Sequence, residues 1–142
     1  MDDKRYKELE KENNALADKF RKHLKACGLS DKTIRNHVDN VCFYLNDYLL
    51  GHYDDVDASA GIDYSYIADF LDYFFIRKCI WSTPSTLRST AASLKKFYRF
   101  MYENDKVSKE AYDEFTSLLK ESLADWCEDC RIYNDGGEYI VI

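Results

Sequence analysis

The sequence predicts an all-α protein, a bundle of four to five helices. Apolar residues make up 46% of the 142 residues, and 12 Tyr and 8 Phe are available, so the chain can bury a core. One Pro and five Gly are few for an all-β protein with many tight turns. Apolar residues recur at spacings of three and four, which is the period of an amphipathic helix.

The first predicted helix covers residues 3–27. Leu9 and Phe20 belong to its apolar stripe, and Gly28 follows where a C-terminal cap is expected. Asn13 is the polar member of the stripe. The stripe predicts a face that packs on the rest of the domain. The alternative is a two-chain coiled coil, in which Asn13 would fix the register.

The second and third helices are predicted from their caps and apolar stripes. Ser30 is the expected N-cap of a helix that ends before Gly51. Residues 51–63 are rich in Asp, Gly and Ser, which indicates a loop. Asp63 can then cap a third helix that reaches about Cys79.

Two more helices complete the predicted bundle. Ser82 or Thr83 can cap the fourth helix, which has a proline in its first turn, where the missing N–H does no harm. Ser108 can cap the fifth helix, which is expected to end at Trp126 or Cys127.

The C-terminal stretch, residues 131–142, reads RIYNDGGEYIVI. Its Gly-Gly pair lies between two short β-prone runs, so it predicts a small hairpin or an edge for pairing with another chain. We therefore expect one helical domain over residues 1–130, followed by a tail.

An internal repeat relates the second and fourth helices. Aligning Thr33 with Thr86 also aligns Arg35 with Arg88, and each copy continues into an aromatic-rich segment. Each copy thus has a hydroxyl cap, an Arg in its first turns and a long apolar face. This pattern predicts a cradle that grips a ligand with the N-terminal ends of both helices.

With these features the sequence resembles the N-terminal core-binding domain of tyrosine recombinases, the phage-integrase family, over roughly residues 15–125. The matching motifs are Gly28-Leu29-Ser30 with Thr33, Ser82 with Thr86, and Phe97-Tyr98-Arg99-Phe100. The resemblance implies a SAM-like helical bundle that forms half of a C-shaped clamp around double-stranded DNA and performs no chemistry.

The resemblance also implies which residues contact DNA. By position these are Lys32, Thr33, Arg35 and Asn36 in the first copy, and Ser85, Thr86, Arg88 and Ser89 in the second. Helix N-termini and Arg side chains suit phosphate, and Arg can also read guanine. The alternative for the hydroxyl residues is that they only cap their helices. Lys95, Lys96 and Arg99 extend the basic segment, either as contacts to the DNA backbone or as a solvated surface.

The sequence departs from the family where chemistry would be expected. None of the three His residues is followed by Arg three positions later, and 142 residues leave no room for a catalytic domain. We therefore expect no enzymatic activity, no cofactor and no small-molecule substrate. Cys127-x-x-Cys130 supplies only two of the four ligands that zinc needs, so we expect no metal.

Charge is unevenly distributed along the chain, whose net charge is −6. Residues 104–142 carry ten acidic and four basic residues, whereas residues 82–103 carry four basic residues and one acidic residue. Such polarity can steer a polyanion despite the net charge. The alternative function is a protein-interaction module that has lost DNA binding and pairs with a recombinase or a second copy.

No apolar run is long enough for a membrane span and no signal peptide is visible, so we expect a cytoplasmic protein.

Overall fold

The computed structural model describes residues 1–136, which form helices and loops with no β-strand among them. The prediction of an all-α bundle is confirmed. The elements are α1 (Asp3–Ala26), α2 (Asp31–Cys42), π-helical η1 (Phe43–Leu50), the 3-10 turn η2 (Ala60–Ile62), α3 (Tyr64–Asp69), π-helical η3 (Phe70–Phe74), α4 (Phe75–Lys78), α5 (Pro84–Glu103) and α6 (Lys109–Asn134). None of the described helices combines the length and hydropathy that crossing a lipid bilayer requires.

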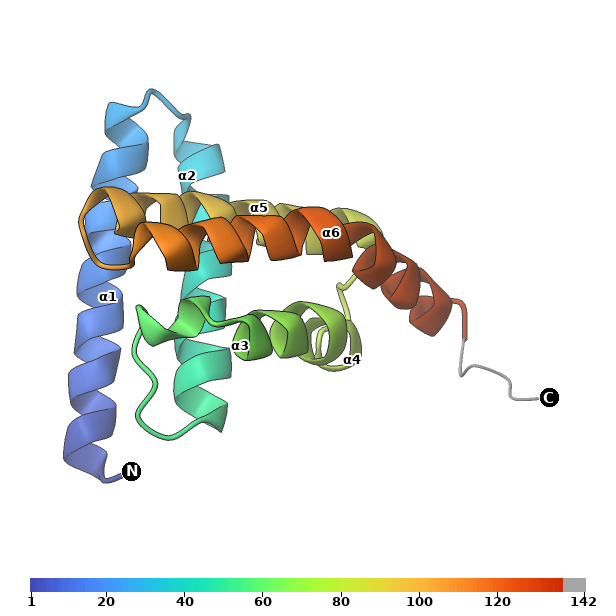
Figure 1. The fold of residues 1–142 in the computed structure, drawn as a ribbon, viewed down its shortest axis with the longest axis horizontal. Helices are drawn as coiled ribbons and strands as arrows, with labels where there is room; N and C mark the ends of the chain where they lie inside the picture. Colours follow the sequence, from blue (N-terminus) through green and yellow to red (C-terminus); the bar gives the residue numbers. More distant parts are fainter. Residues whose placement is uncertain (137–142) are drawn as a thin grey trace.

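Two antiparallel helix pairs cross in the bundle, as Figure 1 shows. Helix α1 lies beside the continuous rod of α2 and η1, and α5 lies beside α6. The second pair crosses the first where α5 packs on α2. The rod of α3, η3 and α4 packs against α6, so that the apolar stripes of all these helices meet in one core.

Helix capping follows the sequence closely. Ser30, Asp63 and Ser108 each accept a hydrogen bond from a backbone N–H in the first turn, as predicted. The helix predicted as the fourth, α5, is capped by Thr83. Ser82 is buried instead, and its hydroxyl donates to the Ile76 carbonyl oxygen at 3.1 Å.

Helix α6 is longer than predicted. It continues past Trp126 and Cys127 to Asn134, because Cys130 also faces the core and extends the helical pattern of burial. The prediction of a β-prone run at the start of the tail was therefore wrong for residues 131–134, which are helical. The second predicted run falls in residues 137–142, which lie outside the described part of the chain.

The apolar stripe of α1 packs on its own domain. Asn13 is 3% exposed, and its Nδ2 donates to the Leu45 carbonyl oxygen (3.3 Å) and to Asn46 Oδ1 (3.0 Å) on η1. Helices α2 and η1 thus cover the face that the coiled-coil alternative would have used, and that alternative was wrong.

Two buried tyrosines hold the loop between η1 and α3 on the core. Tyr44 donates to the Gly61 carbonyl oxygen (2.5 Å), and Tyr98 donates to the Ala58 carbonyl oxygen (2.9 Å). Gly61 allows this close approach, because a Cβ there would lie 2.5 Å from a methyl group of Leu49. A larger residue at this position would push the loop off the core.

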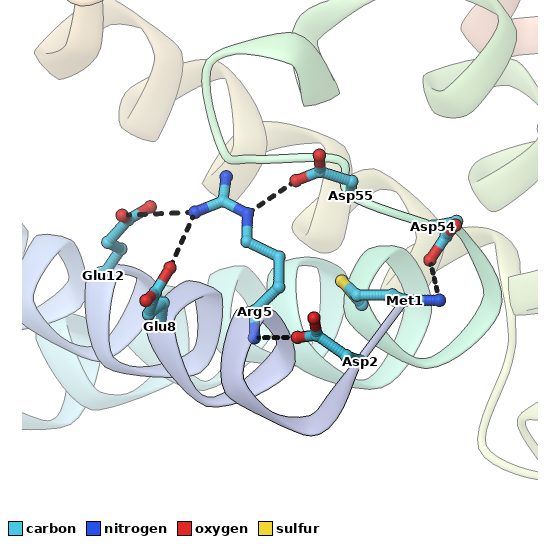
Figure 2. A network of polar contacts seen from close by, with 7 residues as sticks. All are labelled: Met1, Asp2, Arg5, Glu8, Glu12, Asp54 and Asp55. Carbon is cyan, nitrogen blue, oxygen red and sulfur yellow. Dashed lines mark hydrogen bonds and ion pairs between the residues drawn. The ribbon is translucent and has the colours of Figure 1, made fainter.

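Ion pairs attach the outer part of the same loop to α1 (Figure 2). Arg5 Nε donates to Asp55 Oδ1 at 2.7 Å, and the amino group of Met1 lies 2.7 Å from Asp54. Glu8 and Glu12 of α1 flank the same guanidinium. Solvent screens these surface pairs, so each contributes little to stability, but together they position the loop.

A pair of carboxyl groups joins η3 to α6 and predicts a pH-dependent stability. Burial and a hydrogen bond with Asp129 raise the pKa of Asp72 to about 7, against the opposing charge of Arg77. The folded protein therefore holds a proton that the unfolded chain releases near pH 4, and stability falls as the pH rises from about 4 to about 7. Asp72→Asn should raise the free energy of unfolding at pH 8 by about 1 kcal/mol, since solvent screens a half-buried carboxyl.

Urea unfolding of wild type and Asp72→Asn at pH 4.5 and pH 8 checks this expectation. The gain should be present at pH 8 and small at pH 4.5. An equal effect at both pH values would contradict the assignment, because a change in packing alone does not depend on pH.

Candidate nucleic-acid interface

The first turns of α2 and α5 are built in the same way. Ser30 Oγ accepts from the Thr33 backbone N–H (3.3 Å), and Thr83 Oγ1 accepts from the Thr86 backbone N–H (3.0 Å). Thr86 Oγ1 in turn accepts from the Thr83 backbone N–H (2.8 Å), which completes a capping box. Capping thus occupies Ser30 and Thr83, while Ser82 does not cap the helix.

The two repeated helices meet along one groove of about 410 Å³, which we call the repeat groove. Ten of its eleven lining residues form five pairs separated by 53 positions, which is the offset of the internal repeat. The pairs are Thr33 with Thr86, Asn36 with Ser89, His37 with Thr90, Asp39 with Ala92 and Asn40 with Ser93, and Trp81 is the eleventh residue. Equivalent faces of α2 and α5 therefore face each other across the groove.

Ser93 lies where the two helices cross. Its Oγ donates to the Ser89 carbonyl oxygen (3.0 Å) and accepts from Asn40 Nδ2 (3.0 Å). His37 Nδ1 lies 2.7 Å from the same Oγ, and it must supply the proton because the hydroxyl proton is already used. Burial, aided by the charge of Lys96, lowers the pKa of His37, so the ring is neutral at pH 7. The crossing is thus a neutral polar network rather than a charged one.

Basic residues line two further grooves on the flanks of α5. One groove, of about 420 Å³, lies between α5 and α6, and the other, of about 500 Å³, lies between α5 and the end of α1. Among the described residues no Asp or Glu lines either groove. All three grooves adjoin at Ala92. The basic lining residues are Arg88, Lys95 and Lys120 in the first, and Lys95, Lys96 and Arg99 in the second.

The remaining predicted contact residues lie outside these grooves. Lys32, Arg35 and Ser85 are exposed on the first turns of their helices. Within residues 1–136, neither Lys32 nor Arg35 forms an ion pair, and the same holds for Arg88. Their charges are therefore available to an external anion.

Arg99 is less available for binding an external anion than the sequence indicated, because it forms contacts within the protein. Its Nε donates to Glu103 Oε1 at 2.9 Å, one helical turn away. Its guanidinium also lies 5.8 Å from the ring centres of both Tyr102 and Tyr112. These contacts offset part of its charge, so Arg99 is the weakest of the predicted phosphate ligands.

Sequence reasoning missed several residues that the structure brings to this surface. His37, Asn40 and Ser93 form the crossing network, Trp81 lines the repeat groove, and Lys120 of α6 lines a basic groove. The repeat itself contained a signal for two of them, because Asn40 and Ser93 occupy equivalent positions. Nothing in the local sequence indicated Lys120, since its position depends on how α6 packs on α5.

Cys127 and Cys130 belong to the core. Cys127 Sγ lies 3.7 Å from the Pro84 carbonyl oxygen, and Cys130 Sγ lies 3.8 Å from Asn134 Nδ2. Burial raises the pKa of both thiols, so both are protonated at neutral pH. Within the described part of the chain, no group of three or more His, Cys, Asp or Glu residues is arranged to hold a metal ion.

A larger groove, of about 1020 Å³, lies between α6 and the segment of η2 and α3. It has an apolar floor that includes Ile62 and Phe115. Its walls carry acidic and aromatic side chains, which are Asp63, Asp113, Glu114, Glu121, Tyr64 and Tyr66. The molecule therefore presents a basic surface around α5 and a separate acidic groove.

No known protein family matches this chain, and no curated protein or solved structure matches it. The repeat groove, the basic grooves beside it and the acidic groove are the surface features that bear on function. The repeat groove holds four of the residues that the sequence singled out, and the two basic grooves together hold four more.

Proposed function

We propose that this chain is a non-catalytic module that binds double-stranded DNA, with the duplex held at the N-terminal ends of α2 and α5. The observation that carries the proposal is the repeat groove, where equivalent polar residues of both helices face one another. Four of the residues for which the resemblance implies DNA contact line it, namely Thr33, Asn36, Thr86 and Ser89, which supports the proposal.

Electrostatics supports a polyanionic ligand. The N-terminus of a helix carries a partial positive charge and free N–H groups, which favour phosphate. Arg35 and Arg88 occupy equivalent positions near these ends, and Lys95 and Lys96 continue the basic surface along α5. Asp39 is the one acidic residue among those that line the repeat groove.

The proposal predicts weak, salt-sensitive binding. Contacts to four or five phosphates give a slope of about −4 in a plot of log K against log salt concentration. The dissociation constant should lie near ~10⁻⁴–10⁻⁶ M at physiological salt, which is typical of non-specific binding. Fluorescence anisotropy of a labelled 25-base-pair duplex at roughly 50, 100 and 200 mM salt measures both quantities. Absence of binding at the lowest salt concentration would refute DNA binding.

The acidic groove favours a second candidate function, a protein-interaction module. Acidic walls, the exposed ring of Tyr64 and an apolar floor suit a basic segment of a partner protein, such as a recombinase or a second copy. Light scattering at low and high salt separates the two functions. A salt-resistant dimer without DNA affinity supports the interaction module, and a monomer that forms a salt-sensitive DNA complex supports the first proposal.

A further inference from the structure

Two large apolar residues occupy the corners of a tight turn between α4 and α5. The Ser82 backbone N–H donates to the Cys79 carbonyl oxygen at 3.0 Å, which closes a β-turn with Ile80 and Trp81 at its centre. Ile80 is fully exposed (101%) and Trp81 is 54% exposed. Turn corners usually carry Gly, Pro, Asn, Asp or Ser, so this pair is unusual.

The backbone of this turn is firmly held. Ser82 Oγ donates to the Ile76 carbonyl oxygen (3.1 Å), and Asn134 Nδ2 donates to the Ser82 carbonyl oxygen (2.5 Å). Thr86 Oγ1 donates to the Trp81 carbonyl oxygen at 3.1 Å. Bonds from α4, α5 and α6 therefore fix the turn, and Ile80 is presented to solvent by a rigid support.

Trp81 connects the turn to the repeat groove. It is the lining residue without a repeat partner, because Gly28 occupies the equivalent position 53 residues earlier and does not line the groove. The indole packs edge-on against Phe43, with ring centres 5.8 Å apart. Trp81 therefore lies at the surface where DNA is proposed to bind, and Ile80 precedes it in the same turn.

Exposed apolar groups on a rigid support favour a binding role, because their contact with water is unfavourable until a partner covers them. The neighbouring groups indicate which partner. Arg35 and Arg88 are exposed on the helices that border the groove, and neither forms an ion pair within the described residues. A polyanion that also offers apolar surface fits this setting, and stacked base pairs provide that surface between phosphates.

We propose that Ile80 and Trp81 form an apolar wedge that enters between two adjacent base pairs and bends the duplex held in the repeat groove. This inference rests on the proposed DNA binding. Apolar wedges of this kind partly unstack a base step, and the bend brings more of the DNA backbone into contact with the protein. Unstacking a base step costs free energy, so DNA that is already distorted should bind more tightly.

The test uses the full chain with Trp126→Phe, which leaves Trp81 as the single tryptophan. It is titrated with an intact duplex and with the same duplex carrying a central two-nucleotide bulge. Anisotropy of the labelled DNA reports binding, and tryptophan emission reports contact with Trp81. Ile80→Ser is the wedge variant, and Tyr64→Ser, which changes an exposed residue of the acidic groove, is the matched control.

Three results are expected if the wedge exists. Trp81 emission falls with the same midpoint as the anisotropy change, the bulged duplex binds about tenfold more tightly than the intact one, and Ile80→Ser removes most of that preference while Tyr64→Ser keeps it. Trp81→Ser, made in the wild-type background, should also lose most of the preference for the bulged duplex. This variant tests the wedge even if Trp126→Phe fails to fold.

Other outcomes overturn the wedge in distinguishable ways. Binding with unchanged Trp81 emission and an unchanged bulge preference in Ile80→Ser refutes the wedge and leaves DNA binding intact. Absence of any binding refutes both. A wild-type dimer that Ile80→Ser converts to a monomer shows that the turn is a protein interface, which also refutes the wedge.

Discussion

Phe97→Ala is expected to reduce the free energy of unfolding by about 3–5 kcal/mol, the range for removing a buried aromatic ring. Phe97 is completely buried in the second repeated helix. Its ring lies 5.4 Å from that of Phe20 on α1 and 5.1 Å from that of Tyr98, both edge-on. Because small domains have a total stability of about 5–15 kcal/mol, this one change removes a large share of it.

Urea or thermal unfolding monitored by circular dichroism measures the loss. Tyr73→Ala is the matched control, because it also truncates an aromatic ring on a helix but at a residue that is 54% exposed. The control should cost less than about 1 kcal/mol, mainly the contact between the ring and Arg77. Equal losses in the two variants would contradict the assignment of Phe97 to the core.

The fold could be predicted from sequence largely because caps and periodicity are local signals. Ser30, Asp63 and Ser108 each begin a helix as expected, since an N-cap needs only its own side chain and the next three residues. The end of α6 was predicted too early. The burial of Cys130 depends on contacts with residues far away in the chain, which no local pattern contains.

The candidate site could be predicted in part, and the reason is the repeat. Aligning Thr33 with Thr86 selected two faces that do meet in the repeat groove. The hydrogen bonds at the crossing were missed, because a crossing point is set by the packing of whole helices. The ion pair between Arg99 and Glu103 could have been predicted from sequence, because residues four apart on a helix lie next to each other.

The exposure of Ile80 and Trp81 in their turn could not be predicted from the sequence. Aromatic and apolar residues in a helical protein are usually assigned to the core, and most of the aromatic residues here are buried. A turn reverses that rule, because its corners point outward whatever residues occupy them. Only the position of the turn relative to α2 and α5 reveals that Trp81 adjoins the repeat groove.

Arg35→Ala/Arg88→Ala is expected to weaken DNA binding by roughly 100-fold at 50 mM salt, because each lost phosphate contact removes about 0.9 from the slope of log K against log salt. The two residues occupy equivalent positions in the repeat, both are exposed, and neither contributes to the core. The slope should therefore fall from about −4 to about −2 while the unfolding midpoint stays unchanged.

The matched control is Lys4→Ala/Lys7→Ala, which removes the same net charge from exposed positions on the first turns of α1. Those turns lie at the opposite end of the helix pair from the start of α2, as Figure 1 shows. If binding depended only on net charge, both double variants would lose affinity equally, and a defined site at α2 and α5 would be refuted. If the groove binds the duplex, the control keeps nearly the wild-type affinity and slope, since long-range screening at this ionic strength limits its effect to a few-fold.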